Sequence, residues 1–167
     1  MMQKIYGAPF EQNGLQKVGR NKYDIFYGFG KDSESDDTGY NYRQRFDHVP
    51  TLDECRKAIY EVIDSEVQQN ILHGMSFNGS LVWLSAENQR NYAATALQVQ
   101  TDSKNALPVT VKLGTDDSPE YVTFNTSDEY IAFANAVTAY IRKALDEGWQ
   151  EKKAIDWSVY QLSEENT

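Results

Sequence analysis

The segment GKDSESDDTG, at positions 30–39, holds the densest group of side chains that could bind an ion. Four of its residues are carboxylates within six positions, and calcium prefers oxygen ligands of this kind. An EF-hand loop, however, needs glycine at its sixth position for a sharp turn and a carboxylate at its twelfth. Counted from Asp32, these positions hold Asp37 and Arg43. We therefore interpret the segment as a solvated turn, with weak cation binding as the alternative.

The other combinations of reactive residues do not form a catalytic or metal-binding pattern. A zinc site needs several cysteines or histidines at short spacing, whereas His48, His73 and Cys55 stand apart in the sequence. Ser80, in NGSLV, lacks the second glycine of a nucleophile elbow. The adjacent aspartates fall in predicted turns, where solvated carboxylates make poor general acids at neutral pH. We therefore expect no catalytic residues, no metal ligands and no cofactor, and hence a protein that is not an enzyme.

The acidic turn is positioned by two flanking segments that have strand character. Residues 22–30 (KYDIFYGFG) are aromatic and β-branched, and residues 39–47 (GYNYRQRFD) alternate between aromatic and polar side chains. Together they predict an antiparallel hairpin with the acidic turn at its tip. A hairpin alone is marginally stable in water, so its aromatic face must rest on the main domain, another subunit or a sugar. The candidate interaction surface consists of Tyr23, Phe26, Tyr27, Phe29, Tyr40 and Tyr42.

Amphipathic helices are predicted in the remainder of the chain. The first begins at a capping box formed by Thr51 and Glu54 and ends before Gly74. Cys55 falls on its apolar stripe, which favours a small core residue over a nucleophile. The second helix begins at Ser85 as its N-cap. Its expected buried stripe consists of Tyr92, Ala93, Ala96 and Leu97.

A third helix begins at another capping box, Thr126 with Glu129, and Gly148 is expected to end it. Two hairpins are predicted between the helices. Asn78–Gly79 suits a tight turn, and the segment 107–124 alternates apolar and polar side chains on both sides of a polar turn. The predicted fold class is therefore α+β, with antiparallel β-hairpins packed against three main helices.

Charge is unevenly distributed along the 167 residues. The first 50 residues carry seven basic and seven acidic side chains, so the net charge of −9 falls on the remainder. This shift near Pro50 divides the chain into an aromatic-rich β-hairpin extension (1–50), an α+β domain (51–160) and a loose tail (161–167). Such an acidic chain does not suit binding to nucleic acid or to an anionic membrane surface.

The expected cellular compartment follows from the cysteine content and the N-terminal segment. A single cysteine fits a reducing compartment, and MMQKIYGAPFEQNG lacks the basic and apolar regions of a signal peptide. The sequence also has no apolar run long enough to cross a membrane. We expect synthesis in the cytoplasm, without secretion by a signal peptide and without a membrane partner.

Three stretches carry a resemblance to a phage- and prophage-associated domain of unknown function. They are GYNYRQRFDHVPTLDECRKAI, FNGSLVWLSAENQRNYAA and the segment from LPVTVKLG to KKAIDW, and the resemblance covers roughly residues 55–157. Related domains occur near tail-fibre and tail-fibre-assembly genes and bring no catalytic motif. The resemblance implies a structural or assembly protein that contacts other phage proteins or further copies of itself, either as part of the virion or as an assembly protein outside it. A glycan-binding module using the N-terminal tyrosines and an acidic DNA mimic are the alternatives.

Overall fold

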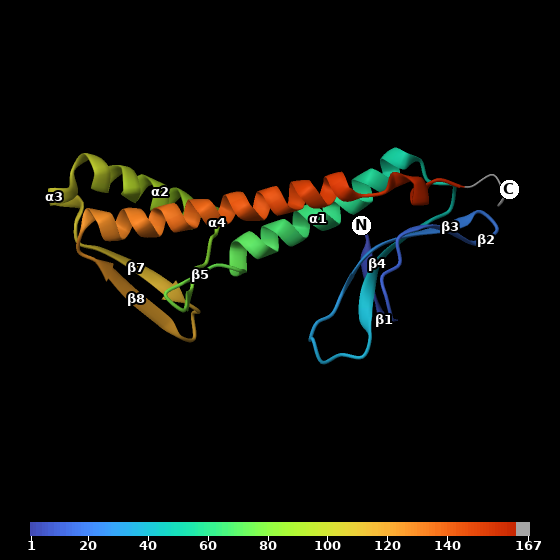
Figure 1. Cartoon of the computed structure of the whole chain (residues 1–167), viewed down its shortest axis with the longest axis horizontal. Helices are drawn as coiled ribbons and strands as arrows, with labels where there is room; N and C mark the ends of the chain where they lie inside the picture. Colours follow the sequence, from blue (N-terminus) through green and yellow to red (C-terminus); the bar gives the residue numbers. More distant parts are fainter. Residues whose placement is uncertain (163–167) are drawn as a thin grey trace. The chain divides into compact units, whose positions relative to one another are not determined.

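The computed structural model describes residues 1–162 and has an α+β fold (Figure 1). Its contacts group into two compact units, one made of residues 1–64 with the chain from residue 151 onward, and the other of residues 65–150. The division falls inside two helices, α1 (Leu52–His73) and α4 (Ser127–Ala154), whereas the sequence placed a boundary near Pro50. Of the expected tail at 161–167, residues 163–167 lie outside the described part of the chain.

The first unit contains a four-stranded antiparallel sheet with the strand order β1-β4-β3-β2. The central strands, β3 (Lys22–Gly30) and β4 (Gly39–Phe46), are the predicted hairpin. The two edge strands, β1 (Gln3–Ala8) and β2 (Gly14–Gly19), were not predicted. The N-terminal region is therefore a complete sheet and not a two-stranded extension, and it offers the aromatic side chains of β3 a core to occupy.

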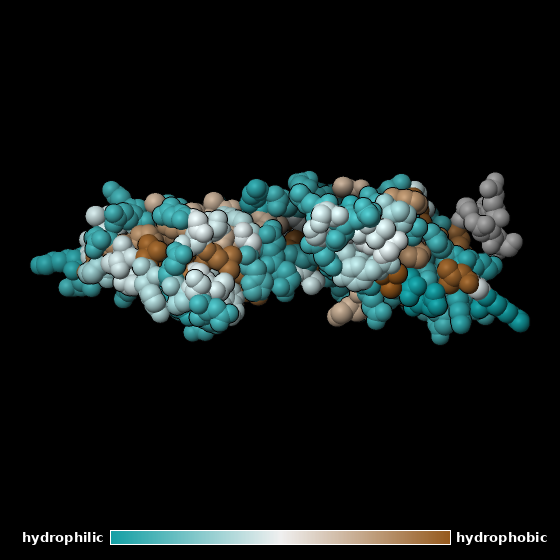
Figure 2. Space-filling model, turned by 90° about the horizontal axis from the view of Figure 1, so that it is seen from below, coloured by the Kyte–Doolittle hydropathy of each residue, from teal (hydrophilic) through white to brown (hydrophobic). Residues whose placement is uncertain are grey.

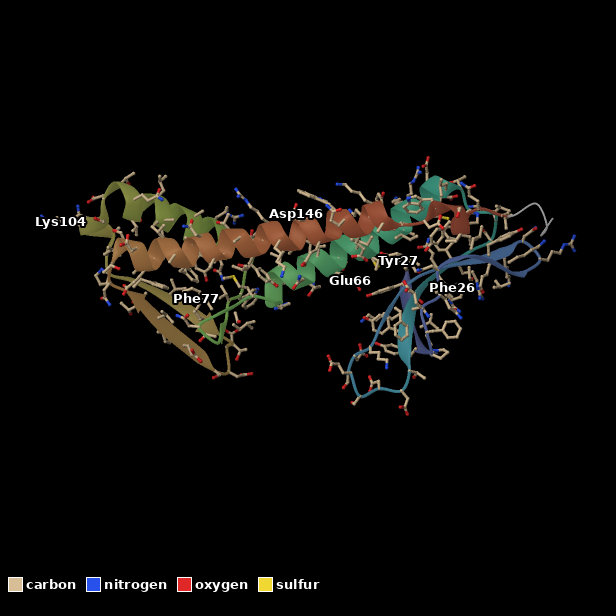
Figure 3. The ribbon with its side chains drawn as sticks, viewed as in Figure 1. Phe26, Tyr27, Glu66, Phe77, Lys104 and Asp146 are labelled. Carbon is tan, nitrogen blue, oxygen red and sulfur yellow. The ribbon has the colours of Figure 1, made fainter. Side chains whose placement is uncertain are left out.

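The core of the first unit lies on one face of this sheet. Phe26 and Tyr27 are neighbours on β3, so they leave the strand on opposite faces (Figure 3). The Tyr27 hydroxyl donates a hydrogen bond to Glu151 Oε1 of α4 at 2.5 Å. The short helix η1 (Trp157–Tyr160) is joined to the sheet by Tyr160, whose hydroxyl donates to the Phe26 carbonyl at 2.9 Å. The fully buried apolar residues of this unit include Ile25, Cys55, Ile59 and Ile63.

An ion pair between a buried carboxylate and a half-exposed arginine lies on the opposite face of the same sheet. Asp24 is 2% exposed, and its cross-strand neighbour Arg45 donates two hydrogen bonds to its carboxylate, at 2.7 and 2.8 Å. Arg43 Nη1 lies 3.8 Å from the same carboxylate. The hydrogen bonds from Arg45 hold the pKa of Asp24 below its usual value, although burial acts in the opposite direction. Arg45 thus stabilises the ionised form of the buried Asp24 carboxylate.

The second unit combines helices with two small hairpins (Figure 1). Its core is built around Phe133 of α4, which is fully buried. The ring centroid of Phe133 lies 5.1 Å from that of Phe77, 5.1 Å from that of Tyr92 and 5.3 Å from that of Phe124. Besides parts of α1 and α4, the elements of this unit are β5 (Ser76–Phe77), β6 (Ser80–Leu81), α2 (Ala86–Thr101), α3 (Ser103–Ala106), β7 (Val109–Gly114) and β8 (Pro119–Phe124).

The local signals read from the sequence are confirmed at several element boundaries. Ser85 caps α2, because its Oγ accepts a hydrogen bond from Asn88 N at 3.1 Å. In the capping box of α1, Glu54 N donates to Thr51 Oγ1 at 3.3 Å and Thr51 N donates to Glu54 Oε2 at 2.8 Å. The turn Asn78–Gly79 has positive φ at both positions, 50° and 88°, which suits a hairpin of two residues.

Two predictions about the helices are wrong. The first concerns Gly148, which lies buried inside α4 and does not end it. The residues that follow, WQEKKA, are mostly good helix formers, and they continue the helix although glycine costs about 1 kcal/mol inside it. The second concerns the expected buried stripe of α2, in which Ala93 is exposed and Leu97 is 63% exposed, while Val99 is buried. The four-residue spacing of the sequence pattern did not reveal which side of α2 faces the core.

Replacing Thr126 with alanine is expected to lower the free energy of unfolding by about 1 kcal/mol. Thr126 Oγ1 accepts a hydrogen bond from Glu129 N at 3.3 Å, and the Glu129 carboxylate accepts one from Thr126 N at 3.0 Å. The substitution leaves the Glu129 amide at the start of α4 without this partner. Urea denaturation measures the loss.

The matched control for this substitution is Thr138→Ala, within the same helix. Thr138 is also exposed, but its hydroxyl only donates back to the carbonyl of Ala134, a contact that does not favour a helix. Thr138→Ala should therefore change the stability by less than about 0.5 kcal/mol. Equal losses in the two variants would contradict the assigned role of the cap.

Candidate functional site

The six aromatic residues of the candidate interaction surface do not share one environment. Tyr23 is 7% exposed and Tyr27 is 8% exposed, so both belong to the core of the first unit. Phe26 lies half-buried on the opposite face of the sheet. The remaining three, Phe29, Tyr40 and Tyr42, are partly or largely accessible.

The structure brings two of these residues together with a tyrosine that the sequence reasoning missed. Tyr6 of β1 lies directly opposite Tyr40 of β4 in the sheet register, and their ring centroids are 5.6 Å apart in an edge-to-face arrangement. Tyr40 makes a second edge-to-face contact with Tyr42, at 5.5 Å. Lys4 Nζ lies 3.8 Å from the centroid of the Tyr40 ring, a cation–π contact. We call Lys4, Tyr6, Tyr40 and Tyr42 the tyrosine cluster.

One carboxylate of the acidic turn contacts this cluster. Asp32 Oδ1 lies 3.8 Å from Lys4 Nζ. A hydrogen bond to Asp32 raises the pKa of the Tyr6 hydroxyl, and partial burial of the hydroxyl acts in the same direction. Burial lowers the pKa of Lys4, but a hydrogen bond to Tyr40 and nearby Asp32 outweigh it, so that the net change is upward. Lys4 is therefore positively charged and Tyr6 is neutral at physiological pH.

The tyrosine cluster lies along an open edge of the sheet. Among the strands of residues 1–162, β1 pairs only with β4, so one row of its backbone groups is unpaired. The opposite edge, β2, is approached by η1, because a Cβ atom on Gly14 would lie 2.8 Å from the carbonyl oxygen of Val159. Tyr6, at 62% exposure, is the most accessible member of the cluster. The β1 edge thus combines unpaired backbone groups with an accessible aromatic side chain.

The rest of the acidic turn forms hydrogen bonds within itself. Residues 31–38 are all exposed. Ser33 N donates to Asp36 Oδ2 at 3.1 Å, and Lys31 Nζ donates to the Asp36 carbonyl at 2.6 Å. The prediction of a solvated turn is confirmed. Within residues 1–162, no group of three or more His, Cys, Asp or Glu side chains is arranged to hold a metal ion.

Two further candidate residues, His48 and Cys55, lie close to the start of α1. His48 contacts two carboxylates, with Nδ1 2.9 Å from Asp47 and Nε2 3.1 Å from Glu54, and both raise the pKa of His48. Its side chain is 53% exposed, so this is a surface ion cluster beside a capping box. Cys55 is fully buried, and this burial raises the pKa of its thiol to about 11. The expectation of a core cysteine is confirmed, and such a thiol is unreactive at neutral pH.

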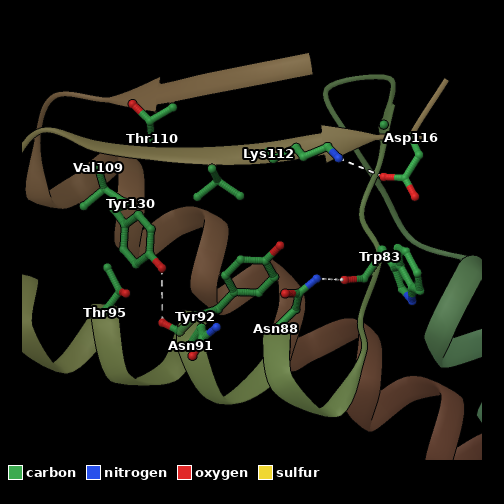
Figure 4. Close-up of a pocket in the computed structure, with 12 residues that line it drawn as sticks. Trp83, Asn88, Asn91, Tyr92, Thr95, Val109, Thr110, Lys112, Asp116 and Tyr130 are labelled. Atoms are coloured by element: carbon green, nitrogen blue, oxygen red, sulfur yellow. Dashed lines mark hydrogen bonds and ion pairs between the residues drawn. The ribbon is translucent and has the colours of Figure 1, made fainter. Parts of the chain in front are cut away.

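A second candidate site is a pocket of about 370 Å³ in the second unit, between α2 and the strand β7 (Figure 4). Trp83, Asn88 and Tyr92 line one side, and Lys112 lines the other. Asn88 Nδ2 donates to the Trp83 carbonyl at 2.9 Å, which fixes the segment that leads into α2. No single sequence motif marks this pocket, because its lining comes from four separate segments of the chain.

Comparison of the chain with family models, with curated proteins and with solved structures found no match. None of the helices within residues 1–162 combines the length and the apolar character that crossing a membrane requires. Figure 2 shows one face of the molecule, on which hydrophobic residues form small separate patches among hydrophilic ones. In the first unit, the candidate site with the best-defined geometry is the tyrosine cluster on the β1 edge, because its rings and Lys4 make specific contacts with one another.

Proposed function

We propose that this protein is a non-enzymatic, phage-derived structural or assembly component that acts by protein–protein contact, with the β1 edge as its contact surface. The tyrosine cluster beside the unpaired edge of β1 is the observation that carries the proposal. The phage origin rests on the sequence resemblance over residues 55–157. The partner that we propose for this edge is a second copy of the chain.

Backbone geometry supports a second copy as the partner. An antiparallel strand related to itself by a two-fold axis supplies matching donors and acceptors, so β1 can pair with β1 of another protomer. Side chains support the contact as well. Tyrosine is favoured at protein interfaces because it buries a large apolar area and keeps a polar tip. Lys4 and Asp32 add one charge of each sign, which lets two identical edges meet without net repulsion.

The two alternative functions receive less support. A glycan bound to the N-terminal tyrosines would stack on the Tyr40 ring, which lies at the centre of the cluster. Lys4 Nζ already lies 3.8 Å from the centroid of that ring and covers it. For a DNA mimic, a row of uncompensated carboxylates would be needed. Several acids instead pair with lysine, including Asp116 with Lys112 at 2.8 Å and Glu147 with Lys143 at 3.7 Å.

Size-exclusion chromatography with light scattering over a series of protein concentrations tests the proposal. The wild type should shift from monomer to dimer as the concentration rises. Tyr6→Ala should raise the dimer dissociation constant by roughly 10-fold or more, the effect of removing an aromatic side chain that carries much of an interface. Circular dichroism should show an unchanged fold, because Tyr6 is 62% exposed.

Tyr121→Ala is the matched control. Tyr121 is an equally exposed tyrosine, at 68%, but it lies on β8 in the second unit. This variant should dimerise like the wild type. A wild-type protein that stays monomeric at every concentration, or a Tyr121→Ala variant that loses dimers as strongly as Tyr6→Ala, would refute contact through β1.

A further inference from the structure

We infer that Asn78, at the tip of the β5–β6 hairpin, is a site of spontaneous covalent modification in the folded protein, whereas Asn13 is protected from the same reaction. The reaction converts the side-chain amide to a carboxylate and needs only water as a second reactant. This site goes beyond the proposed protein–protein contact and lies in the second unit, away from the tyrosine cluster. The inference rests on a comparison of the two Asn-Gly dipeptides in the sequence, Asn13–Gly14 and Asn78–Gly79.

The reaction takes place between the side chain of an asparagine and the backbone nitrogen of the next residue. That nitrogen attacks the side-chain carbonyl carbon and forms a C–N bond that closes a cyclic imide. The bond from this carbon to the amide nitrogen breaks, and ammonia leaves with the proton of the backbone nitrogen. Water then adds to either ring carbonyl and opens the ring, which gives aspartate or isoaspartate. Glycine as the next residue favours the attack, because it has no Cβ atom to restrict the backbone.

At Asn78 the reacting groups are accessible. Asn78 and Gly79 are both exposed, between the half-buried Phe77 and the buried Ser80. A Cβ atom on Gly79 would have no atom within 4 Å apart from its chain neighbours, so no other segment blocks rotation of this peptide unit. Within residues 1–162, no hydrogen bond holds the Asn78 side chain or the Gly79 nitrogen. Only two residue pairs join β5 to β6, so local opening of the turn costs little.

At Asn13 the same groups are held in place. Asn13 Oδ1 accepts a hydrogen bond from Gly28 N at 2.8 Å, and Asn13 Nδ2 donates to Glu11 Oε1 at 2.8 Å. Gly14 is buried at the start of β2, and a Cβ atom on it would lie 2.8 Å from the Val159 carbonyl oxygen. The side chain and the backbone nitrogen can meet here only after these contacts break. The structure therefore separates two sites that are equivalent in sequence.

The modification at Asn78 should weaken the second unit. Isoaspartate carries the backbone through the side chain, so it lengthens a turn of two residues. The residues on either side of this turn are anchored. The Phe77 ring centroid lies 5.1 Å from that of Phe133, and Ser80 Oγ donates a hydrogen bond to Glu120 Oε2. A longer turn cannot keep both anchors in place without strain. Aspartate, in contrast, adds only a charge, because it tolerates positive φ as asparagine does.

The experiment is incubation of the full-length protein at mildly alkaline pH, followed by peptide mapping with mass spectrometry over time. The same incubation in urea, which unfolds the chain, is the internal control, and there both sites should convert at similar rates. In the folded protein, Asn78 should convert within roughly 10-fold of its rate in urea. Asn13 should convert at least roughly 10-fold more slowly than in urea, because two hydrogen bonds of its side chain must break first.

The effect on stability is measured on the isoaspartate form, separated by ion-exchange chromatography. It should unfold at a lower urea concentration than the fresh wild type. Freshly prepared Asn78→Asp is the matched control and should unfold as the wild type does, because it carries the added charge without the longer backbone. The inference is overturned if folded Asn78 stays intact while the unfolded chain converts, or if folded Asn13 converts as fast as Asn78. Equal stability of the isoaspartate form and Asn78→Asp would overturn the effect on the turn.

Discussion

Replacing Phe133 with alanine is expected to lower the free energy of unfolding by about 3–5 kcal/mol, the largest effect of any substitution considered for this protein. Phe133 is fully buried, and four aromatic rings surround it. The substitution removes a large apolar side chain and leaves a cavity that the rigid neighbouring rings cannot fill. Urea denaturation followed by circular dichroism measures the change.

Hydrogen exchange with mass spectrometry locates this effect. Amides within residues 65–150 should exchange faster in Phe133→Ala, because the whole ring cluster belongs to that unit. Leu97→Ala is the control, since Leu97 is 63% exposed and should change stability by less than about 0.5 kcal/mol. A loss below about 1 kcal/mol for Phe133→Ala would mean that the ring cluster does not organise the second unit.

Replacing Arg45 with alanine is expected to lower the stability of the first unit at neutral pH, and by more than replacing Arg43 does. The substitution removes two hydrogen bonds and leaves the carboxylate of Asp24, which is 2% exposed, with only Arg43 at 3.8 Å. The cost of removing the Asp24 carboxylate from water is then offset only in part, by Arg43 and by water that enters where the half-exposed Arg45 side chain was. Arg43→Ala is the matched control and should cost less, because Arg43 contacts the carboxylate only at this longer distance.

The dependence of this effect on pH is a second measurement of the same interaction. Hydrogen bonds from Arg45 lower the pKa of Asp24 in the folded protein below the value of about 3.9 for an unfolded aspartate. A lowered folded pKa means that the stabilisation is complete above the unfolded pKa and is lost as the pH falls through the folded pKa. The stability difference between the wild type and Arg45→Ala should therefore shrink as the pH is lowered from neutral to below about 4. A difference independent of pH would show that the loss comes from packing alone.

The features that the sequence predicted correctly depend on contacts between near neighbours in the chain. The capping boxes at Thr51 and Thr126 and the N-cap at Ser85 each involve groups three residues apart. The turn at Asn78–Gly79 needs only the backbone freedom of two residues. Since local sterics and hydrogen bonds decide these features, the α+β fold class and most element boundaries could be predicted from the residues alone.

The features that it missed depend on contacts between distant segments. Tyr23 and Tyr27 are core residues, and the Tyr27 hydroxyl bonds to Glu151, 124 residues further along the chain, so no local pattern signals their burial. The edge strands β1 and β2 were not predicted either. Tyr6 joined Tyr40 only through the register of β1 against β4. A pattern of aromatic residues indicates that a large apolar surface must be buried, but it does not indicate which segments of the chain bury it.

The sequence by itself determined where the three main helices begin, the hairpin turns, the solvated acidic loop and the buried state of Cys55. Tertiary structure alone decided which tyrosines form the cluster on the β1 edge, that Asp24 is buried beside Arg45, and that the Tyr92 hydroxyl faces a pocket beneath β7. The physical reason is the separation along the chain between the residues whose contacts fix each feature. Caps and turns are settled within a few residues, whereas burial and pockets depend on segments separated by tens of residues, whose pairing is set by the packing of the whole unit.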